Sequence, residues 1–100
     1  MYTQQELINR LTHVFKKYPI KRAALFGSYS QGGQNIDSDV DIFLEIDYTN
    51  VFPDIILTIW DDVERETNLK ADILTHGSLE TAPKRFSERI LNEMRYFYEA

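Results

Sequence analysis

Apolar residues recur at intervals of three and four in three parts of the chain, which is the pattern of an amphipathic helix. In the first part, Thr3 and Glu6 fit a capping box at the start of a helix, and Pro19 ends it. The second part covers residues 52–67, and the third begins at Pro83. The apolar stripe of the third is Phe86, Ile90, Leu91, Met94 and Phe97. We therefore expect three helices, the last continuing to Phe97.

Three shorter segments have the pattern of β-strands. Residues 21–26 become apolar toward their end and stop at Gly27, and residues 70–75 form a similar short run. Residues 39–47 alternate, so that most of the apolar side chains lie on one face, and all of the acidic ones lie on the other together with Phe43. The polar residues 28–38 are expected to form a loop or one short helical turn. This order predicts an α/β or α+β fold, with helices packed on a small mixed β-sheet.

Length and composition fit a single domain over residues 1–100, with a hydrophobic share of 43% that is sufficient for one core. The formal net charge of −5 argues against direct nucleic-acid binding, which depends on cations that neutralise phosphates. The chain has no cysteine, which excludes a cysteine-based zinc site or thiol nucleophile. No apolar run has the ~18 residues of a membrane span, and the N-terminus lacks a signal-peptide core. We therefore expect a cytoplasmic protein that is not embedded in a membrane.

Three carboxylates are the strongest candidates for chemistry. Asp39 and Asp41 are two residues apart on a predicted strand, so both side chains emerge on the same face, where they repel each other. Asp72 lies in the middle of another predicted strand, where a carboxylate is costly unless it is paired or bound to a metal. If the two strands are neighbours, the three acids converge and could hold two Mg²⁺ ions for phosphoryl transfer. Taken singly, Asp39 could cap a turn and Asp72 could be a charge that protects a sheet edge.

The Gly27-Ser28 pair follows directly on the first predicted strand. Glycine allows a sharp turn and a close approach of a ligand, and the serine hydroxyl with nearby backbone N–H groups suits the phosphates of a nucleotide. The alternative is that Ser28 caps a short helix.

Together these residues form a pattern: Gly27-Ser28, ten residues, Asp39-Val40-Asp41, and a third acid at Asp72. In this the chain resembles the nucleotidyltransferase superfamily that includes DNA polymerase β. It resembles most closely the minimal nucleotidyltransferase (MNT) domains, many of which are antitoxins paired with HEPN-domain toxins. The resemblance implies a polymerase β palm-like fold over almost the whole chain.

The resemblance also implies roles for single residues. Asp39 and Asp41 would hold Mg²⁺, Asp72 would complete the metal site and help to activate the attacking hydroxyl, and Gly27 and Ser28 would hold the triphosphate. The implied reaction transfers AMP from ATP to a hydroxyl of a partner protein, here a HEPN toxin.

One position departs from the family pattern, because Gln31 stands where many relatives carry a basic residue. Two alternatives therefore stay open: a non-catalytic antitoxin that masks its toxin, and the catalytic subunit of a two-chain enzyme acting on small molecules. Homo-oligomer formation is left open.

Overall fold

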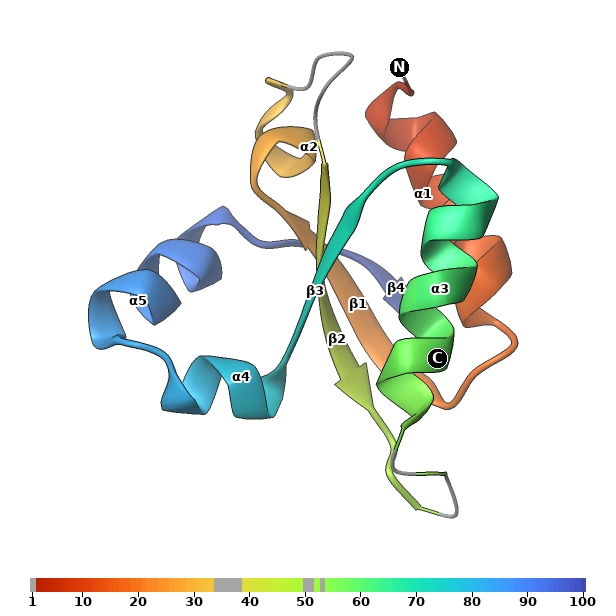
Figure 1. Ribbon diagram of the computed structural model, residues 1–100. Coiled ribbons are helices and arrows are strands. Elements are labelled where there is room, and N and C mark those ends of the chain that lie inside the picture. Colours follow the sequence, from red (N-terminus) through yellow and green to blue (C-terminus); the bar gives the residue numbers. More distant parts are fainter. Residues whose placement is uncertain (1, 34–38, 50–51, 53) are drawn as a thin grey trace.

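The computed structural model describes residues 2–33, 39–49, 52 and 54–100 (Figure 1). Its elements are α1 (Gln4–Phe15), β1 (Ile20–Phe26), α2 (Ser28–Gln31), β2 (Val40–Ile46), α3 (Ile55–Thr67), β3 (Ala71–Thr75), α4 (His76–Thr81), α5 (Lys84–Glu93) and β4 (Arg95–Glu99). The strands form one mixed sheet in the order β3-β2-β1-β4. β1 is antiparallel to β2 and β4, whereas β2 and β3 are parallel.

The predicted mixed sheet with packed helices is confirmed, and residues 28–31 form the expected short turn of helix. The second half of the predicted loop, residues 34–38, lies outside the described residues. The third predicted helix is wrong at its end, because residues 95–99 form β4 and not a continuation of α5. Met94 has extended backbone angles that end the helix, and the aromatic residues after it suit a strand beside β1.

The helix α4 was also not expected from the hydrophobic pattern. Thr75 and Ser78 form a capping box at its start, a local signal in a segment too short to show helical periodicity. In the described part of the chain, no helix has the length and apolar character needed to cross a membrane.

The two faces of the sheet are covered by different helices (Figure 1). α1 and α3 lie against one face, and the larger core cluster there includes Leu11 and Phe15 of α1, Ile59 of α3 and Leu44 of β2. α4 and α5 lie against the other face, where the cluster is smaller: Ala24, Phe26, Phe43, Leu79, Ile90 and Met94. Phe97 packs on Phe15, at a ring-centroid distance of 6.1 Å, and so belongs to the first face and not to the stripe of α5.

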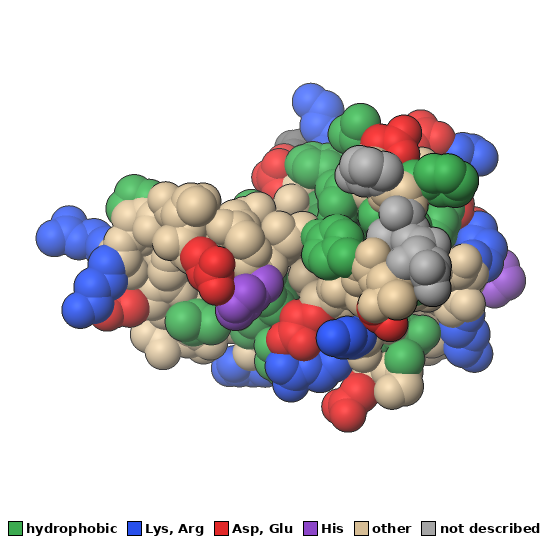
Figure 2. Space-filling view, turned by 90° about the horizontal axis from the view of Figure 1, so that it is seen from below, with side chains coloured by type: hydrophobic (Ala, Val, Ile, Leu, Met, Phe, Trp, Pro, Cys, Tyr) green, Lys and Arg blue, Asp and Glu red, His purple; other side chains and the backbone are tan. Residues whose placement is uncertain are grey.

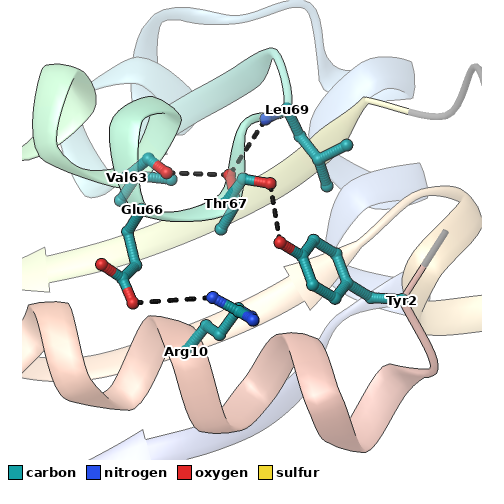
Figure 3. A network of polar contacts seen from close by, with 6 residues as sticks. All are labelled: Tyr2, Arg10, Val63, Glu66, Thr67 and Leu69. Carbon is teal, nitrogen blue, oxygen red and sulfur yellow. Dashed lines mark hydrogen bonds and ion pairs between the residues drawn. The ribbon is translucent and has the colours of Figure 1, made fainter.

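A polar network joins α1 to the connection between α3 and β3 (Figure 3). The Tyr2 hydroxyl donates to the Thr67 carbonyl oxygen at 2.9 Å, and the buried Thr67 hydroxyl donates to the Val63 carbonyl at 2.8 Å. Next to it, the Ala71 N–H donates to the Glu64 carboxylate at 2.8 Å. These bonds fix the point where β3 begins, one residue before Asp72.

The opposite end of the molecule, where β2 ends and α3 begins, is shown in Figure 2. Acidic and basic side chains are intermixed on this face, and hydrophobic side chains gather between them. Three large apolar residues of this region are exposed: Tyr48, Phe52 and Leu57.

Packing of α5 predicts a contrast between two adjacent residues. Ile90 is fully buried and Leu91 is 59% exposed. We expect Ile90→Ala to lower the free energy of unfolding by about 2–4 kcal/mol, because it removes apolar contacts and leaves a cavity. Leu91→Ala, the matched control, is expected to change it by less than about 0.5 kcal/mol. Urea unfolding followed by circular dichroism measures both, and equal losses would show that α5 is not packed through Ile90.

Candidate active site

Two of the predicted acids face each other across neighbouring strands. β2 and β3 run parallel with Asp41 and Asp72 as direct partners in the register, as convergence of the acids requires. On the other side, Asp41 is the partner of Phe26 at the end of β1. Asp41 is half-buried and Asp72 is exposed on the edge strand; Asp39 is exposed just before β2 begins. The sheet therefore sets Asp41 between the Gly-Ser turn and Asp72.

Burial and nearby acids raise the pKa of Asp41. Burial first, and then the carboxylates of Asp72 and Asp39, raise the pKa of Asp41 from its ordinary 3.8 to about 6. A hydrogen bond with Asp72 and the charge of Glu93 add to the same shift. A carboxyl whose pKa is raised by burial and by nearby acids is a candidate for a functional site.

Gly27 turns the chain directly beside Asp41. Its φ of +70° is in the region that favours glycine, and a Cβ atom there would overlap the Oδ2 atom of Asp41 and lie 3.1 Å from its Cγ atom. Gly27 is also the N-cap of α2, where no side chain caps the helix, so the alternative that Ser28 is the cap is wrong. Ser28 is instead the first residue of the helix. Tyr29 is fully buried in the core and anchors this turn.

A pocket of about 350 Å³ opens over these residues. The sheet contributes Asp41 and Asp72 at its base, with Gly27 beside them. Trp60 of α3 lines one part of the pocket, and α5 contributes Phe86, Arg89 and Glu93. The pocket thus combines acids, a turn of backbone, three aromatic rings (Phe26, Trp60 and Phe86) and one basic side chain.

Glu93 and Arg89 were not singled out from the sequence. Glu93 Oε2 accepts a hydrogen bond of 3.2 Å from the Gly27 N–H, which ties α5 to the turn. The two residues are four apart on a helix, so their shared side could be read from the spacing. Nothing in that spacing indicated which element they would face.

The donor set fits Mg²⁺, because this ion takes oxygen ligands and is commonly held by one or two carboxylates together with substrate phosphates. Asp41 and Asp72 are the pair placed to hold it. Over the described ranges, no group of three His, Cys, Asp or Glu side chains is arranged to hold a metal ion. The structure thus brings two of the three acids together, and metal-binding and catalytic roles for Asp39, Asp41 and Asp72 stay predictions, as do the nucleotide-binding roles of Gly27 and Ser28.

The fold and the paired acids define the class, a nucleotidyltransferase of the polymerase β type. Residues 9–100 match the family described as polymerase beta, nucleotidyltransferase, and the chain belongs to that family. The predicted family, fold and enzyme class are thereby confirmed.

Relatives in Methanocaldococcus jannaschii are named as candidate protein adenylyltransferases. One is 36% identical over 78 residues, covering 75% of this chain and 77% of the relative. A second is 31% identical over 88 residues, covering 88% of this chain and 90% of the relative.

Solved structures share the fold at lower identity. A candidate minimal nucleotidyltransferase superposes with a TM-score of 0.72 at 21% identity, covering 94% of this chain and 95% of its own. A toxin–antitoxin complex with AMP-PNP gives a TM-score of 0.71 at 18% identity, covering 93% of this chain and 73% of that one. A tri-AMPylated HEPN toxin of Shewanella oneidensis with its MNT antitoxin gives 0.67 at 14% identity, covering 97% and 73%.

The close approach of Gly27 to Asp41 predicts different costs in stability for two Gly→Ala substitutions, at Gly27 and at Gly32, which both have a positive φ. We expect Gly27→Ala to lower the free energy of unfolding by about 2–4 kcal/mol, through backbone strain and overlap with Asp41. Gly32 has φ +77° but open space around its Cβ position, so Gly32→Ala is expected to cost only about 1 kcal/mol. In an Asp41→Ala background, Gly27→Ala should cost about as much as Gly32→Ala. Urea unfolding of the four variants completes this cycle, and an unchanged cost in the Asp41→Ala background would show that the overlap is not with that side chain.

The raised pKa of Asp41 predicts how stability depends on pH without metal. Because the folded pKa of about 6 exceeds the ordinary 3.8, the native state binds more protons between these values, and stability falls as pH rises through this window. Asp41→Asn should therefore be as stable as the wild type below pH ~4. Above pH ~7 it should be more stable by about 1–2 kcal/mol, after allowance for solvent screening of a half-buried group.

The measurement is urea unfolding in EDTA across this pH range, with Asp61→Asn, an exposed acid of α3, as the control. The groups facing Asp41 are Asp72, Asp39 and Glu93, with Arg89 in the same pocket. A constant difference between wild type and Asp41→Asn at all pH values would contradict the shift.

Proposed function

We propose that this chain transfers AMP from ATP, with Mg²⁺, to a hydroxyl of a partner protein, and that the partner is a HEPN-type toxin which the transfer silences. The observation that carries the proposal is the register of Asp41 with Asp72 beside the Gly27 turn. Two carboxylates on adjacent strands, lining a pocket of about 350 Å³, are suited to a metal-assisted transfer of a phosphoryl group.

The partner is supported by the relatives and by the surface. The relatives from Methanocaldococcus jannaschii are named for adenylyl transfer to protein, and a structural neighbour is an MNT antitoxin with an AMPylated HEPN toxin. The pocket of about 350 Å³ lies at the small end of ligand sites, which suits one nucleotide and leaves the acceptor to come from outside. Exposed Phe86 beside the pocket and exposed Leu91 on the same helix offer apolar surface for such a partner.

In the proposed reaction, the acceptor hydroxyl oxygen bonds to the α-phosphorus of ATP as the bond to the pyrophosphate oxygen breaks. The hydroxyl proton passes to a carboxylate, and Asp72 is suited to accept it because β3 is an edge strand and this side chain is exposed to an incoming partner. Asp41 is half-buried on β2, between β1 and β3, so it is suited to hold the metal rather than to exchange a proton. Mg²⁺ on Asp41 and Asp72, with Asp39 nearby, would draw charge from the phosphate oxygens. AMP joined to the acceptor, pyrophosphate and one proton are the products.

The test is incubation of the chain with its co-purified partner, ATP and Mg²⁺, followed by intact-mass spectrometry. We expect one or more AMP additions on the partner, and at least a ~100-fold slower transfer with Asp39→Asn, Asp41→Asn or Asp72→Asn. Asp61→Asn removes an exposed acid of α3 and serves as the charge-matched control, with wild-type rates expected.

Two outcomes would contradict the proposal. A partner that stays unmodified but is inhibited equally by wild type and Asp41→Asn would indicate an antitoxin that masks its toxin, the alternative that Gln31 favours. Transfer of AMP to a small molecule and not to the partner would indicate a two-chain enzyme of small-molecule type.

A further inference from the structure

Arg89 is the basic side chain of the candidate active site. Over the described residues, the lining of the pocket contains no other Lys or Arg. Arg89 lies on α5 opposite Asp41 and Asp72, and its guanidinium carbon is 5.5 Å from the centroid of the Phe86 ring. A cation–π contact of this kind holds the guanidinium by its face and leaves the N–H groups at its edge to donate.

None of the ion pairs within the described ranges involves Arg89. This is informative because three acids, Asp41, Asp72 and Glu93, line the same pocket. Positive and negative charge are therefore present in one pocket without neutralising each other there.

The Gly-Ser turn itself carries no positive side chain for an anion. Gln31 is neutral and exposed, and its amide contacts the Ser30 hydroxyl at 3.4 Å. The Gly27 N–H already donates to Glu93. With four residues, α2 is also too short to supply a helix dipole of useful size. A triphosphate bound beside this turn needs a cation from another element.

We propose that Arg89 binds the phosphate groups of the nucleotide, supplying from α5 the positive charge that the loop lacks at Gln31. The inference rests on the proposed function and adds a phosphate-binding residue to it. The acids on the sheet would then face metal, and the guanidinium would face the anionic part of the same ligand. Its planar edge can donate two parallel hydrogen bonds to phosphate oxygens, which a lysine cannot reproduce. Bound nucleotide would thus link α5 to the sheet.

An exposed arginine on a helix is more often a solvated surface charge, and Arg85 provides the matched comparison. It lies one turn earlier on α5, is also exposed and carries the same charge, but it does not line this pocket. Arg85→Ala and Arg89→Ala therefore change net charge and helix surface equally and differ in access to the site.

The experiment uses Trp60, the one tryptophan of the chain, which lines the same pocket. Quenching of its fluorescence by ATP in Mg²⁺ gives the dissociation constant, and titration calorimetry measures the same constant independently. We expect Arg89→Ala to raise the dissociation constant of ATP about 10-fold and Arg89→Lys about 3-fold, with Arg85→Ala unchanged. The affinity of Arg89→Ala should also depend less on NaCl between 50 and 500 mM than that of the wild type, because one screened charge pair is lost. Thermal unfolding of each variant checks that α5 stays packed.

The inference would be overturned if Arg89→Ala bound ATP within two-fold of wild type, or if its loss equalled that of Arg85→Ala. A loss with unchanged salt dependence would show that Arg89 acts through packing and would overturn it as well. If the wild-type chain binds ATP but transfers no AMP, the proposed function fails while the role of Arg89 in phosphate binding can still be judged. If the wild type does not bind ATP by either method, both fail.

Discussion

The side chain of Asp41 lies between two close neighbours, and the rest of the fold is arranged around these three residues. On one side Gly27 passes so close that any larger residue would overlap the carboxylate, and on the other side stands Asp72 in direct register. Gly27 directly follows Phe26, the residue of β1 that pairs with Asp41, and Asp72 pairs with Asp41 from β3. Burial, and then the charges of Asp72 and Asp39, raise the pKa of this carboxyl, and the register of β2 with β3 keeps Asp72 beside it.

The two faces of the sheet have different roles: one holds most of the hydrophobic core, and the other carries the candidate active site. The face under α1 and α3 holds the larger core cluster, and its polar network fixes the start of β3. The face under α4 and α5 has a small cluster, and α5 has only Ile90 as a buried residue. Since few contacts hold α5, the pocket between it and the sheet is the part of the site that can adjust when a ligand enters. The larger core on one face therefore holds in place a pair of like-charged acids on the other.

The predictable part of this molecule was the part encoded in local spacing. Alternation over residues 39–47 placed Asp41 on the opposite face from Val40, Ile42 and Leu44. The position of Asp72 in the middle of a short apolar strand indicated that its carboxylate is costly there unless it is paired or bound to a metal. The parallel pairing that joins them was not predicted, because spacing along one strand does not show which strand lies next to it, and the structure supplies it. β4 was missed because aromatic residues such as Phe97 fit a helical stripe as well as a strand, and only the long-range pairing with β1 decides between them.

The same limit explains why Arg89 and Glu93 were not found from the sequence. Their spacing on a helix was visible, but the partners of a helix face are set by packing over many residues, here Ile90 against the small cluster. Glu93 adds a fourth negative charge to a site that already repels itself, and it occupies the Gly27 N–H. This arrangement is costly for the chain alone and would become favourable with a ligand that brings cations to the acids and anions to Arg89. A metal-bound nucleotide carries both kinds of charge in one molecule, so it would complement the charges of the acids and of Arg89 together.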